Sequence, residues 1–316
     1  MGVDLNCAQL LIRAKTNGAS FERMATLGRQ ELHASRPDLL SILRRNNYHP
    51  SAQCQSKLLD PTTVYAEDFF TLLGAKEIVA IDASDYEGAQ VIHDMNEPIP
   101  DDLESSFDLF LDGGTLEHVF DFPTASMNCM RTVRPGGRFV SFTMANNFSG
   151  HGFYQFSPEL FFRLLSGKNG YSVETCIEWE AVHGARFYQV PDPASLGTRI
   201  ELTSRTGTYL FVQARRIGDI SAGYTPRQSD YVEQWEASQA VQKIGTSDSA
   251  GVSRNRFRAF LKKSRVLHSG VLNAREWARS KGPLRRWMIK TEYRRRLLHR
   301  NSRAYMRTLE EIRVRL

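Results

Sequence analysis

The chain has 316 residues, of which 41% are hydrophobic, and a formal net charge of +6. This length allows one large domain with an appendage, and the apolar content predicts a sizeable core. No apolar run approaches the roughly 18 residues of a membrane-spanning helix, and the N-terminus lacks the charged and apolar regions of a signal peptide. We therefore expect a cytoplasmic protein.

The first part of the chain alternates between helix and strand patterns. Apolar residues at helical spacing predict a helix over residues 4–17, and residues 21–27 (FERMATL) predict the first strand. A helix is expected at residues 37–45. Residues 46–64 are polar and predict an irregular insertion, after which residues 64–73 predict another helix.

Three strand-like segments that each end in an aspartate come next, followed by a fourth after a Pro-Gly-Gly turn. They are residues 77–84 (EIVAIDAS), 89–96 (AQVIHDMN), 107–114 (FDLFLDGG) and 136–147 (GGRFVSFTMANN). Each is a short apolar, β-branched or aromatic stretch bounded by turn residues, which is typical of strands buried on both faces.

Further helices and strands complete the pattern. Residues 122–133 predict a helix, and Ser157-Pro158-Glu159 predicts a helix start because it combines a capping hydroxyl, a proline and an acid. Residues 171–179 and 208–216 alternate like the last two strands of a sheet.

This alternation predicts an α/β fold, a doubly wound Rossmann-like seven-stranded sheet with right-handed crossovers. The predicted domain covers residues 1–217. Residues 218–253 are rich in small and polar residues and predict a linker with one helix near residues 229–244. Residues 254–316 predict a C-terminal extension of basic helices.

The positive charge is concentrated in that extension. The extension contains 20 Lys and Arg and 4 Asp and Glu. Residues 1–253 contain 21 Lys and Arg and 31 Asp and Glu. The sequence therefore predicts an acidic body joined to a basic tail with a different role. The tail could pack onto the body, or it could bind nucleic acid. It could also bind an anionic membrane, which would place the protein at the inner face of the membrane.

The four cysteines are scattered and form no C-x-x-C pair. Isolated thiols in a chain without a signal peptide indicate a reducing compartment, and we expect them to be unpaired. No spacing of His, Cys and Asp resembles a dedicated zinc site, so we expect no metal.

The three aspartates predict the position of a binding site. Asp82, Asp94 and Asp112 end successive predicted strands, and the carboxyl ends of parallel strands form the edge where open α/β sheets bind ligands. Carboxylates there can accept hydrogen bonds from ribose hydroxyls and an adenine amine. Gly113 would let a ligand approach the backbone closely. We expect a nucleoside-like cofactor.

Residues 21–216 resemble the class I S-adenosylmethionine-dependent methyltransferases. The matching motifs are Leu116-Glu117-His118-Val119 and RTVRPGGRFV at residues 131–140. The resemblance implies the cofactor S-adenosyl-L-methionine, with Asp82 at its ribose. It also implies that Asp94 and Met95 flank the adenine and that Asp112 and Gly113 lie near the methionine moiety.

The first loop departs from the pattern of that family. The usual acid-x-Gly-x-Gly loop reads Thr26-Leu27-Gly28-Arg29-Gln30 here, with one glycine and no acid. Gly28 is the expected cofactor contact in this loop. Arg29 either reaches the methionine carboxylate, a bidentate match, or faces solvent.

Methyl transfer from a sulfonium needs mainly orientation, and a base only when the acceptor carries a proton. His118 is a candidate base. His151 and Tyr154 lie in a polar and aromatic loop after the predicted strand at residues 136–147. They are candidates for the acceptor site, and the alternative is that they anchor the loop. His93 is expected to point into the core.

The sequence narrows the acceptor only by class. It lacks the Pro-Pro-aromatic motif of base amino methylation and a cysteine after proline for pyrimidine methylation. We expect a methyltransferase acting on a hydroxyl or amine of a small molecule or of a glycan or lipid precursor. The alternatives are a catalytically silent binding module and an RNA methyltransferase that uses the basic tail. A nicotinamide dehydrogenase is disfavoured because G-x-G-x-x-G is absent after the first strand.

Overall fold

The structure is a computed structural model that describes residues 2–60, 62–182, 185–196, 199–200, 202, 204, 206–221 and 223–244. The predicted basic helices of residues 254–316 lie outside the described residues. Among the described residues, no helix is both long enough and apolar enough to cross a membrane.

A mixed eight-stranded sheet forms the centre of the molecule, with strand order β5-β4-β2-β6-β7-β10-β8-β9. Its strands are β2 (Arg23–Leu27), β4 (Glu77–Asp82), β5 (Val91–Ile92), β6 (Phe107–Asp112), β7 (Val133–Asn146), β8 (Tyr171–Glu180), β9 (Tyr188–Gln189) and β10 (Thr208–Arg216). The first five strands in this order pair in parallel, whereas β10 pairs antiparallel with both β7 and β8.

This order confirms the predicted doubly wound fold. The parallel strands follow the Rossmann order, in which the chain leaves β2 toward β4 and later returns to β6 on the other side of β2. The carboxyl ends of β2 and β6 therefore flank the topological switch point, where open sheets bind their ligands. All seven predicted strands are present, and the two-residue β9 adds an eighth at the edge.

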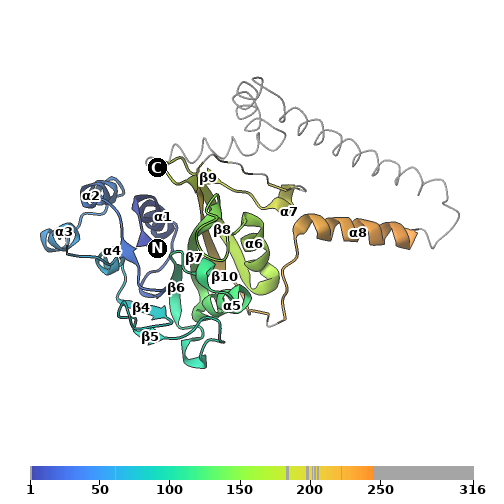
Figure 1. Ribbon diagram of the computed structural model, residues 1–316, viewed down its shortest axis with the longest axis horizontal. Coiled ribbons are helices and arrows are strands. Elements are labelled where there is room, and N and C mark those ends of the chain that lie inside the picture. The colour runs from blue at the N-terminus through green and yellow to red at the C-terminus, as the bar shows by residue number, and fades with distance from the viewer. Residues whose placement is uncertain are drawn as a thin grey trace, which may run out of the picture.

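Helices cover both faces of this sheet (Figure 1). They are α1 (Leu5–Thr16), α2 (Arg36–Arg45), α3 (Ala52–Leu59), α4 (Glu67–Leu72), α5 (Phe122–Thr132), α6 (Pro158–Leu164), α7 (Pro193–Leu196) and α8 (Ser229–Ile244). One face buries α1, α2 and α4 in a single apolar cluster, and the other face buries α5 and α6 in a second. A two-stranded sheet of β1 (Gly2–Val3) and β3 (Glu31–Leu32) lies outside the main sheet.

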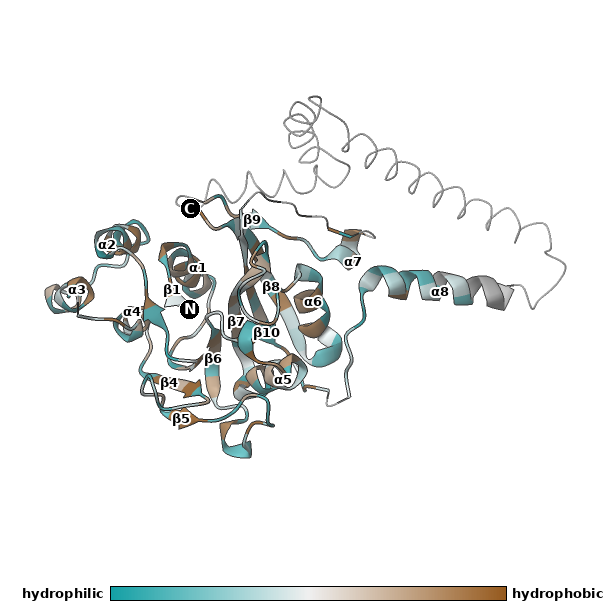
Figure 2. Cartoon of the chain, viewed as in Figure 1, coloured by the Kyte–Doolittle hydropathy of each residue, from teal (hydrophilic) through white to brown (hydrophobic). Residues whose placement is uncertain are grey.

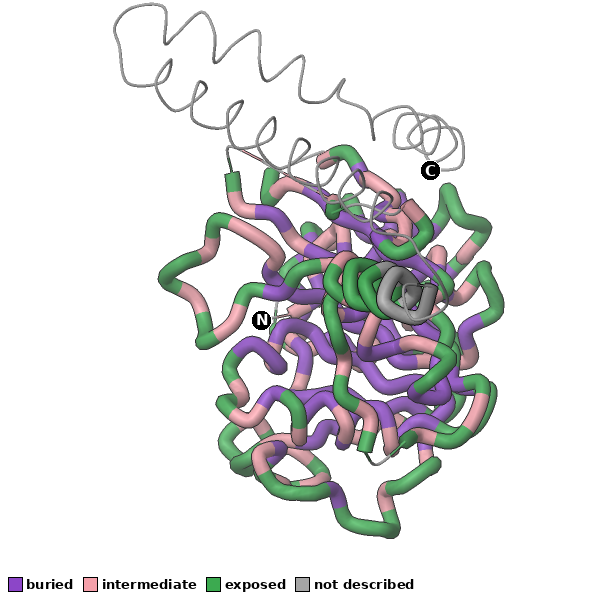
Figure 3. The backbone as a smooth tube through the Cα atoms, turned by 90° about the vertical axis from the view of Figure 1, so that its right-hand side faces the viewer, coloured by how far each residue is buried: buried purple, intermediate pink, exposed green. Residues whose placement is uncertain are grey.

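The central strands are apolar because they are covered on both faces. Every residue of β6 is buried, with Leu109 and Leu111 in the first cluster and Phe110 in the second. Alternate side chains of a strand point to opposite faces, so the short apolar run Leu109–Leu111 supplies both clusters. Figure 3 shows this buried interior surrounded by exposed loops.

Two local predictions were wrong. The segment predicted as irregular, residues 46–64, contains α3, whose N-terminus is capped by the Ser51 hydroxyl and which buries Leu58 completely. One buried leucine is too weak a pattern to indicate a helix. The segment over residues 89–96 pairs only at Val91 and Ile92, so His93 lies just after the strand and is half-buried rather than in the core.

The predicted linker contains α8, as expected from its sequence. This helix extends from the domain beyond α7 and carries a largely polar, exposed surface (Figures 1 and 2). Its aromatic residues Tyr231 and Trp235 are exposed and stack on each other, with ring centroids 6.1 Å apart.

Glu178 of β8 is a buried acid that should make stability depend on pH. Burial raises its pKa to about 7, so the folded state favours the protonated form. The stability that this carboxyl contributes is present below its unfolded pKa and is lost as the pH rises through about 7.

We expect Glu178→Gln, which stays neutral, to gain stability relative to wild type between pH 5 and pH 8. The relative gain should be on the order of 2 kcal/mol, measured as the free energy of unfolding in urea at each pH. Glu180→Gln, two residues along the strand, controls for the loss of a carboxylate. A difference that does not grow with pH contradicts the prediction.

Candidate functional site

Three segments converge at the switch point of the sheet. Gly28 follows β2 with φ of +69°, and its N–H donates to the Ile81 carbonyl of β4 at 2.8 Å. A Cβ at Gly28 would lie 3.4 Å from both Asp82 Oδ2 and Thr115 Oγ1. The Thr115 hydroxyl donates to the Leu27 carbonyl at 3.0 Å, which ties the segment after β6 to the end of β2. The ends of β2, β4 and β6 therefore meet at one place.

Asp82 lies at this meeting point. It is half-buried, and its Oδ1 accepts the N–H of Ser84 at 3.3 Å. A half-buried carboxylate at the carboxyl end of β4 can accept hydrogen bonds from two neighbouring hydroxyls. This is the placement that the sequence predicted for a ribose ligand.

Asp94 lies in the turn after β5, not in the strand. Its Oδ1 accepts from the backbone N–H and the side-chain amide of Asn96 at 2.9 and 2.7 Å. These bonds lower the pKa of Asp94, the backbone bond most. The side chain is exposed, and the neighbouring Met95 is 4% exposed. The carboxylate therefore shapes the turn beside the site and keeps a surface open to a ligand.

Asp112 is inside the protein. Its Oδ1 accepts backbone N–H groups of Gly114, Thr115 and Leu116 at 3.3, 2.9 and 3.1 Å, and its Oδ2 accepts the Ser141 hydroxyl at 2.6 Å. These bonds hold the turn that leads into the short 3₁₀ helix η2 (Leu116–His118). The structure thus does not present the Asp112 carboxylate to a ligand, because its oxygens are occupied in shaping the turn that contains Gly113.

Sequence reasoning missed the side chain of Gln30, which packs against Gly113. Its Nε2 donates to the carbonyls of Leu27 and Gly28 at 2.8 and 3.2 Å, and the residue is 3% exposed. Its Oε1 is buried without a hydrogen-bond partner among the described residues. A Cβ at Gly113 would lie 1.7 Å from that oxygen. Gln30 therefore fills the space that a second glycine in the first loop would leave open.

Arg29 is engaged away from the loop backbone. Its Nε pairs with Glu67 Oε1 at 2.6 Å, its Nη1 donates to the Glu87 carbonyl at 3.0 Å, and its guanidinium lies 3.7 Å from the Tyr65 ring centroid. Neither predicted alternative, a ligand carboxylate or solvent alone, describes this arrangement. The partners come from distant segments, so no local spacing indicated them.

The structure brings the two predicted histidines together. His118 of η2 and His151 of the loop after β7 face each other through their Nε2 atoms at 3.1 Å. Burial, and then the neighbouring His151, lower the pKa of His118. The two histidines are 33 positions apart in the chain, so the sequence did not indicate that they form a pair.

The loop that contains His151 is attached to η2 by its backbone. The N–H groups of Phe153 and Tyr154 both donate to the carbonyl of Glu117, at 2.8 and 3.2 Å. Gly152 has φ of +66°, and a Cβ there would lie 2.8 Å from the same carbonyl oxygen. A glycine at this position is therefore required for the loop to approach so closely.

Tyr154, a predicted acceptor-site residue, has its hydroxyl engaged. It donates to the carbonyl of Phe120 at 2.6 Å, and its ring stacks on Phe156 with centroids 5.8 Å apart. This geometry is that of a loop anchor, the alternative weighed from the sequence. Phe120 and Phe153, which the sequence did not single out, are 72% and 66% exposed and meet edge to face at 5.8 Å. They form an aromatic rim beside the histidine pair.

Glu117 is the second residue that sequence reasoning passed over. It is fully buried, its Oε2 accepts the Thr143 hydroxyl at 3.1 Å, and its Oε1 has no hydrogen-bond partner among the described residues. Burial, followed by the charge of Asp112, raises the pKa of Glu117 to about 8. The motif Leu-Glu-His could have indicated it, but was used only as a family signature.

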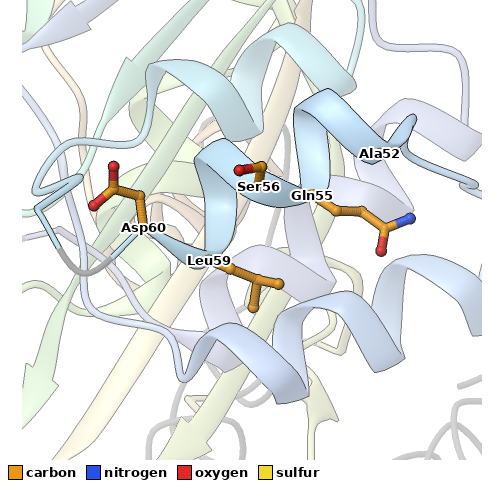
Figure 4. Close-up of a pocket in the computed structure, with 5 residues that line it drawn as sticks. All are labelled: Ala52, Gln55, Ser56, Leu59 and Asp60. Carbon is orange, nitrogen blue, oxygen red and sulfur yellow. The ribbon is translucent and has the colours of Figure 1, made fainter.

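A separate hollow of about 550 Å³ lies against α3, and none of the candidate-site residues described above lines it. Figure 4 shows that one helix and the residue after it supply the five lining residues, Ala52, Gln55, Ser56, Leu59 and Asp60. Asp60 Oδ1 already accepts from the N–H and hydroxyl of Thr62. We assign this hollow no role.

The comparisons with known proteins give structural similarity alone. No family model and no curated protein matches the chain. One similar solved structure is the 1,6-didemethyltoxoflavin-N1-methyltransferase of Burkholderia thailandensis with 1,6-didemethyltoxoflavin and S-adenosylhomocysteine bound, at 15% identity over 67% of this chain and 77% of that one, TM-score 0.35. A second is the N-methyltransferase NodS of Bradyrhizobium japonicum, at 12% identity over 67% and 96%, TM-score 0.36.

A third is the branched-chain polyamine synthase of Thermus thermophilus in complex with N4-aminopropylspermidine and 5'-methylthioadenosine. It is 12% identical over 70% of this chain and 58% of that one, with a TM-score of 0.36. The strand order described above therefore defines the fold by itself: the chain has a doubly wound, Rossmann-like α/β sheet.

The close approach at Gly152 leads to a test of how the loop is held. We expect Gly152→Ala to destabilise the protein by about 1–3 kcal/mol, because the left-handed backbone is strained with a side chain and the Cβ would meet the Glu117 carbonyl at 2.8 Å. Gly150→Ala is the matched control, since a Cβ there meets nothing within 4 Å. Urea unfolding measures both, and equal stabilities would contradict the proposed attachment.

Proposed function

We propose that this protein is an S-adenosylmethionine-dependent methyltransferase acting on a hydroxyl or amine of a small molecule or of a glycan or lipid precursor. The observation that carries the proposal is the convergence of Gly28, Asp82 and Thr115 at the switch point of the Rossmann-like sheet. Ligands of open α/β sheets bind at this point. The basic tail lies outside the described residues, so an RNA acceptor stays a prediction.

The residues present fit the adenosine end of the cofactor. Asp82 offers a half-buried carboxylate for the ribose hydroxyls, and hydrogen bonds to a charged group contribute about 1.5–3 kcal/mol each. The turn of Asp94 and Met95 lies beyond the next strand, β5, where an adenine would extend from such a ribose.

Gln30 provides the observation that concerns the methionine end of the cofactor, a buried hydrogen-bond acceptor without a donor. Gln30 Oε1 is buried and unpaired among the described residues, which is costly unless a donor completes it. A cationic α-amino group is such a donor, and the missing acid of the first loop leaves this role to another residue. Gln30 would thus take over the contact that the family's acidic residue makes.

The cofactor, when bound, supplies an electrophilic methyl group. The protein's own contribution is then to hold the acceptor in line and to exclude water, and orientation of this kind supplies up to about 7–11 kcal/mol. Phe120 and Phe153 offer an exposed apolar surface for the body of an acceptor. His118 and His151 lie beside it as polar groups for the acceptor hydroxyl or amine.

A second candidate, the catalytically silent module, is favoured by the same glutamine. Gln30 packs where a second glycine would leave room, with its oxygen over Gly113. If the side chain cannot move, it blocks the methionine end of the cofactor. The protein would then bind an adenosine-like ligand or none.

Calorimetric titration with S-adenosylhomocysteine tests the proposed cofactor site. We expect wild type to bind, and Asp82→Ala to weaken the affinity at least tenfold, about 1.4 kcal/mol, because the ribose loses its acceptor. Asp85→Ala, an exposed acid three residues further on, is the matched control and should bind like wild type. Absence of binding by the folded wild type at millimolar ligand excludes the methyltransferase proposal.

Gln30 separates the two candidate functions. If its oxygen accepts from the amino group, Gln30→Gly should weaken S-adenosylhomocysteine binding about tenfold or more, since one hydrogen bond to a charged group contributes about 1.5–3 kcal/mol. If its side chain blocks the site, wild type fails to bind and Gln30→Gly creates binding. The same titration measures both outcomes.

A further inference from the structure

Three side chains that can bind a metal ion meet where η2 and the loop after β7 lie against each other. Glu117, His118 and His151 each offer one ligand atom, and these atoms all lie within 4.8 Å of one another. We propose that they bind a divalent transition-metal ion of the Zn²⁺ type. The spacing of these residues did not indicate a metal in the sequence, because the fold brings His151 to the other two.

The separation of the histidines suits a shared ion. Their Nε2 atoms are 3.1 Å apart. Two nitrogens that each lie about 2.1 Å from one ion are about 3.0–3.4 Å apart when the angle at the ion is between a right angle and the tetrahedral value. The rings therefore need little rearrangement to become two ligands of one ion.

The carboxylate supplies an independent observation. Glu117 is fully buried, and its Oε1 has no hydrogen-bond partner in the part of the chain that the structure describes. An unsatisfied buried oxygen of this kind is costly, and a cation next to it removes the cost. The Thr143 hydroxyl donates to the other oxygen at 3.1 Å and so orients the carboxylate, as hydrogen-bond partners of metal ligands do.

The backbone holds the cluster together. Phe153 and Tyr154 donate to the carbonyl of Glu117 itself, and Gly152 lets the two chains touch. Because these contacts fix the loop one to three residues after His151, the meeting of the three side chains does not depend on the histidines attracting each other. A site with ligands on two rigidly paired segments is preorganised.

The ligand set selects the class of ion. Two imidazoles and one carboxylate match transition ions, including catalytic zinc with an open position and non-haem iron, whereas Mg²⁺ and Ca²⁺ prefer oxygen ligands. With three protein ligands, the ion retains a position for a further ligand. An acceptor hydroxyl bound there would lose its proton to solvent more readily. This role rests on the proposed methyl transfer, whereas metal binding itself does not.

Titration of the untagged, chelator-treated full chain with Co²⁺, without S-adenosylmethionine, tests the proposal. We expect one Co²⁺ per chain, seen by its visible absorption, and displacement of the cobalt by Zn²⁺. His118→Ala, His151→Ala and Glu117→Gln should each weaken Co²⁺ binding at least tenfold. His49→Ala, an exposed histidine outside the cluster, is the matched control and should bind like wild type.

Zn²⁺ should also raise the melting temperature of wild type and not of the His118→Ala/His151→Ala double variant, because only a protein with a native-state site is stabilised by its ligand. The two histidines are not fully buried, so this variant keeps the test open if Glu117→Gln does not fold. Millimolar or absent Co²⁺ binding by wild type, or binding that survives in the double variant, overturns the proposal. The result is independent of cofactor titration, so the two proposals fail separately.

Discussion

The site depends on one buried carboxylate, that of Asp112. Its two oxygens accept three backbone N–H groups and one hydroxyl, which hold the chain in a tight turn as it leaves β6. That turn places Gly113 under the first loop and Thr115 against β2, and it starts η2. Glu117 and His118 follow on η2. An acid that was expected to contact a ligand thus acts by arranging the residues that can.

The sheet was predictable because its strands are simple. Mostly apolar strands such as β6 are buried on both faces, and turn residues mark their ends. Position along the chain was therefore enough to place Asp82 at the edge of the sheet. The pattern was insufficient where burial is slight: α3 buries only Leu58, and β5 pairs over two residues. There, tertiary contacts rather than local periodicity decide the structure.

The details of the site were less predictable, for a different reason. The contacts of Arg29 with Glu67 and Tyr65, and the meeting of His118 with His151, join residues that are distant in the chain. In the sequence, Gln30 was noted only because it stands where the first loop of the family usually has its second glycine. Its effect comes from where its amide lies relative to Gly113, which is information that one sequence does not contain. The sequence thus named several residues that lie at the candidate site, but neither Gln30 nor Glu117, and it did not reveal which residues contact one another.

The loop after β7 is attached to η2 mainly through its backbone. Its hold on η2 runs through main-chain groups of Phe153 and Tyr154 and through the bare Cα of Gly152. The ring of Phe153 is exposed, meets Phe120 edge to face and takes no part in these main-chain contacts. A substitution at position 153 can therefore change the size and polarity of this exposed rim while the main-chain attachment of the loop is retained.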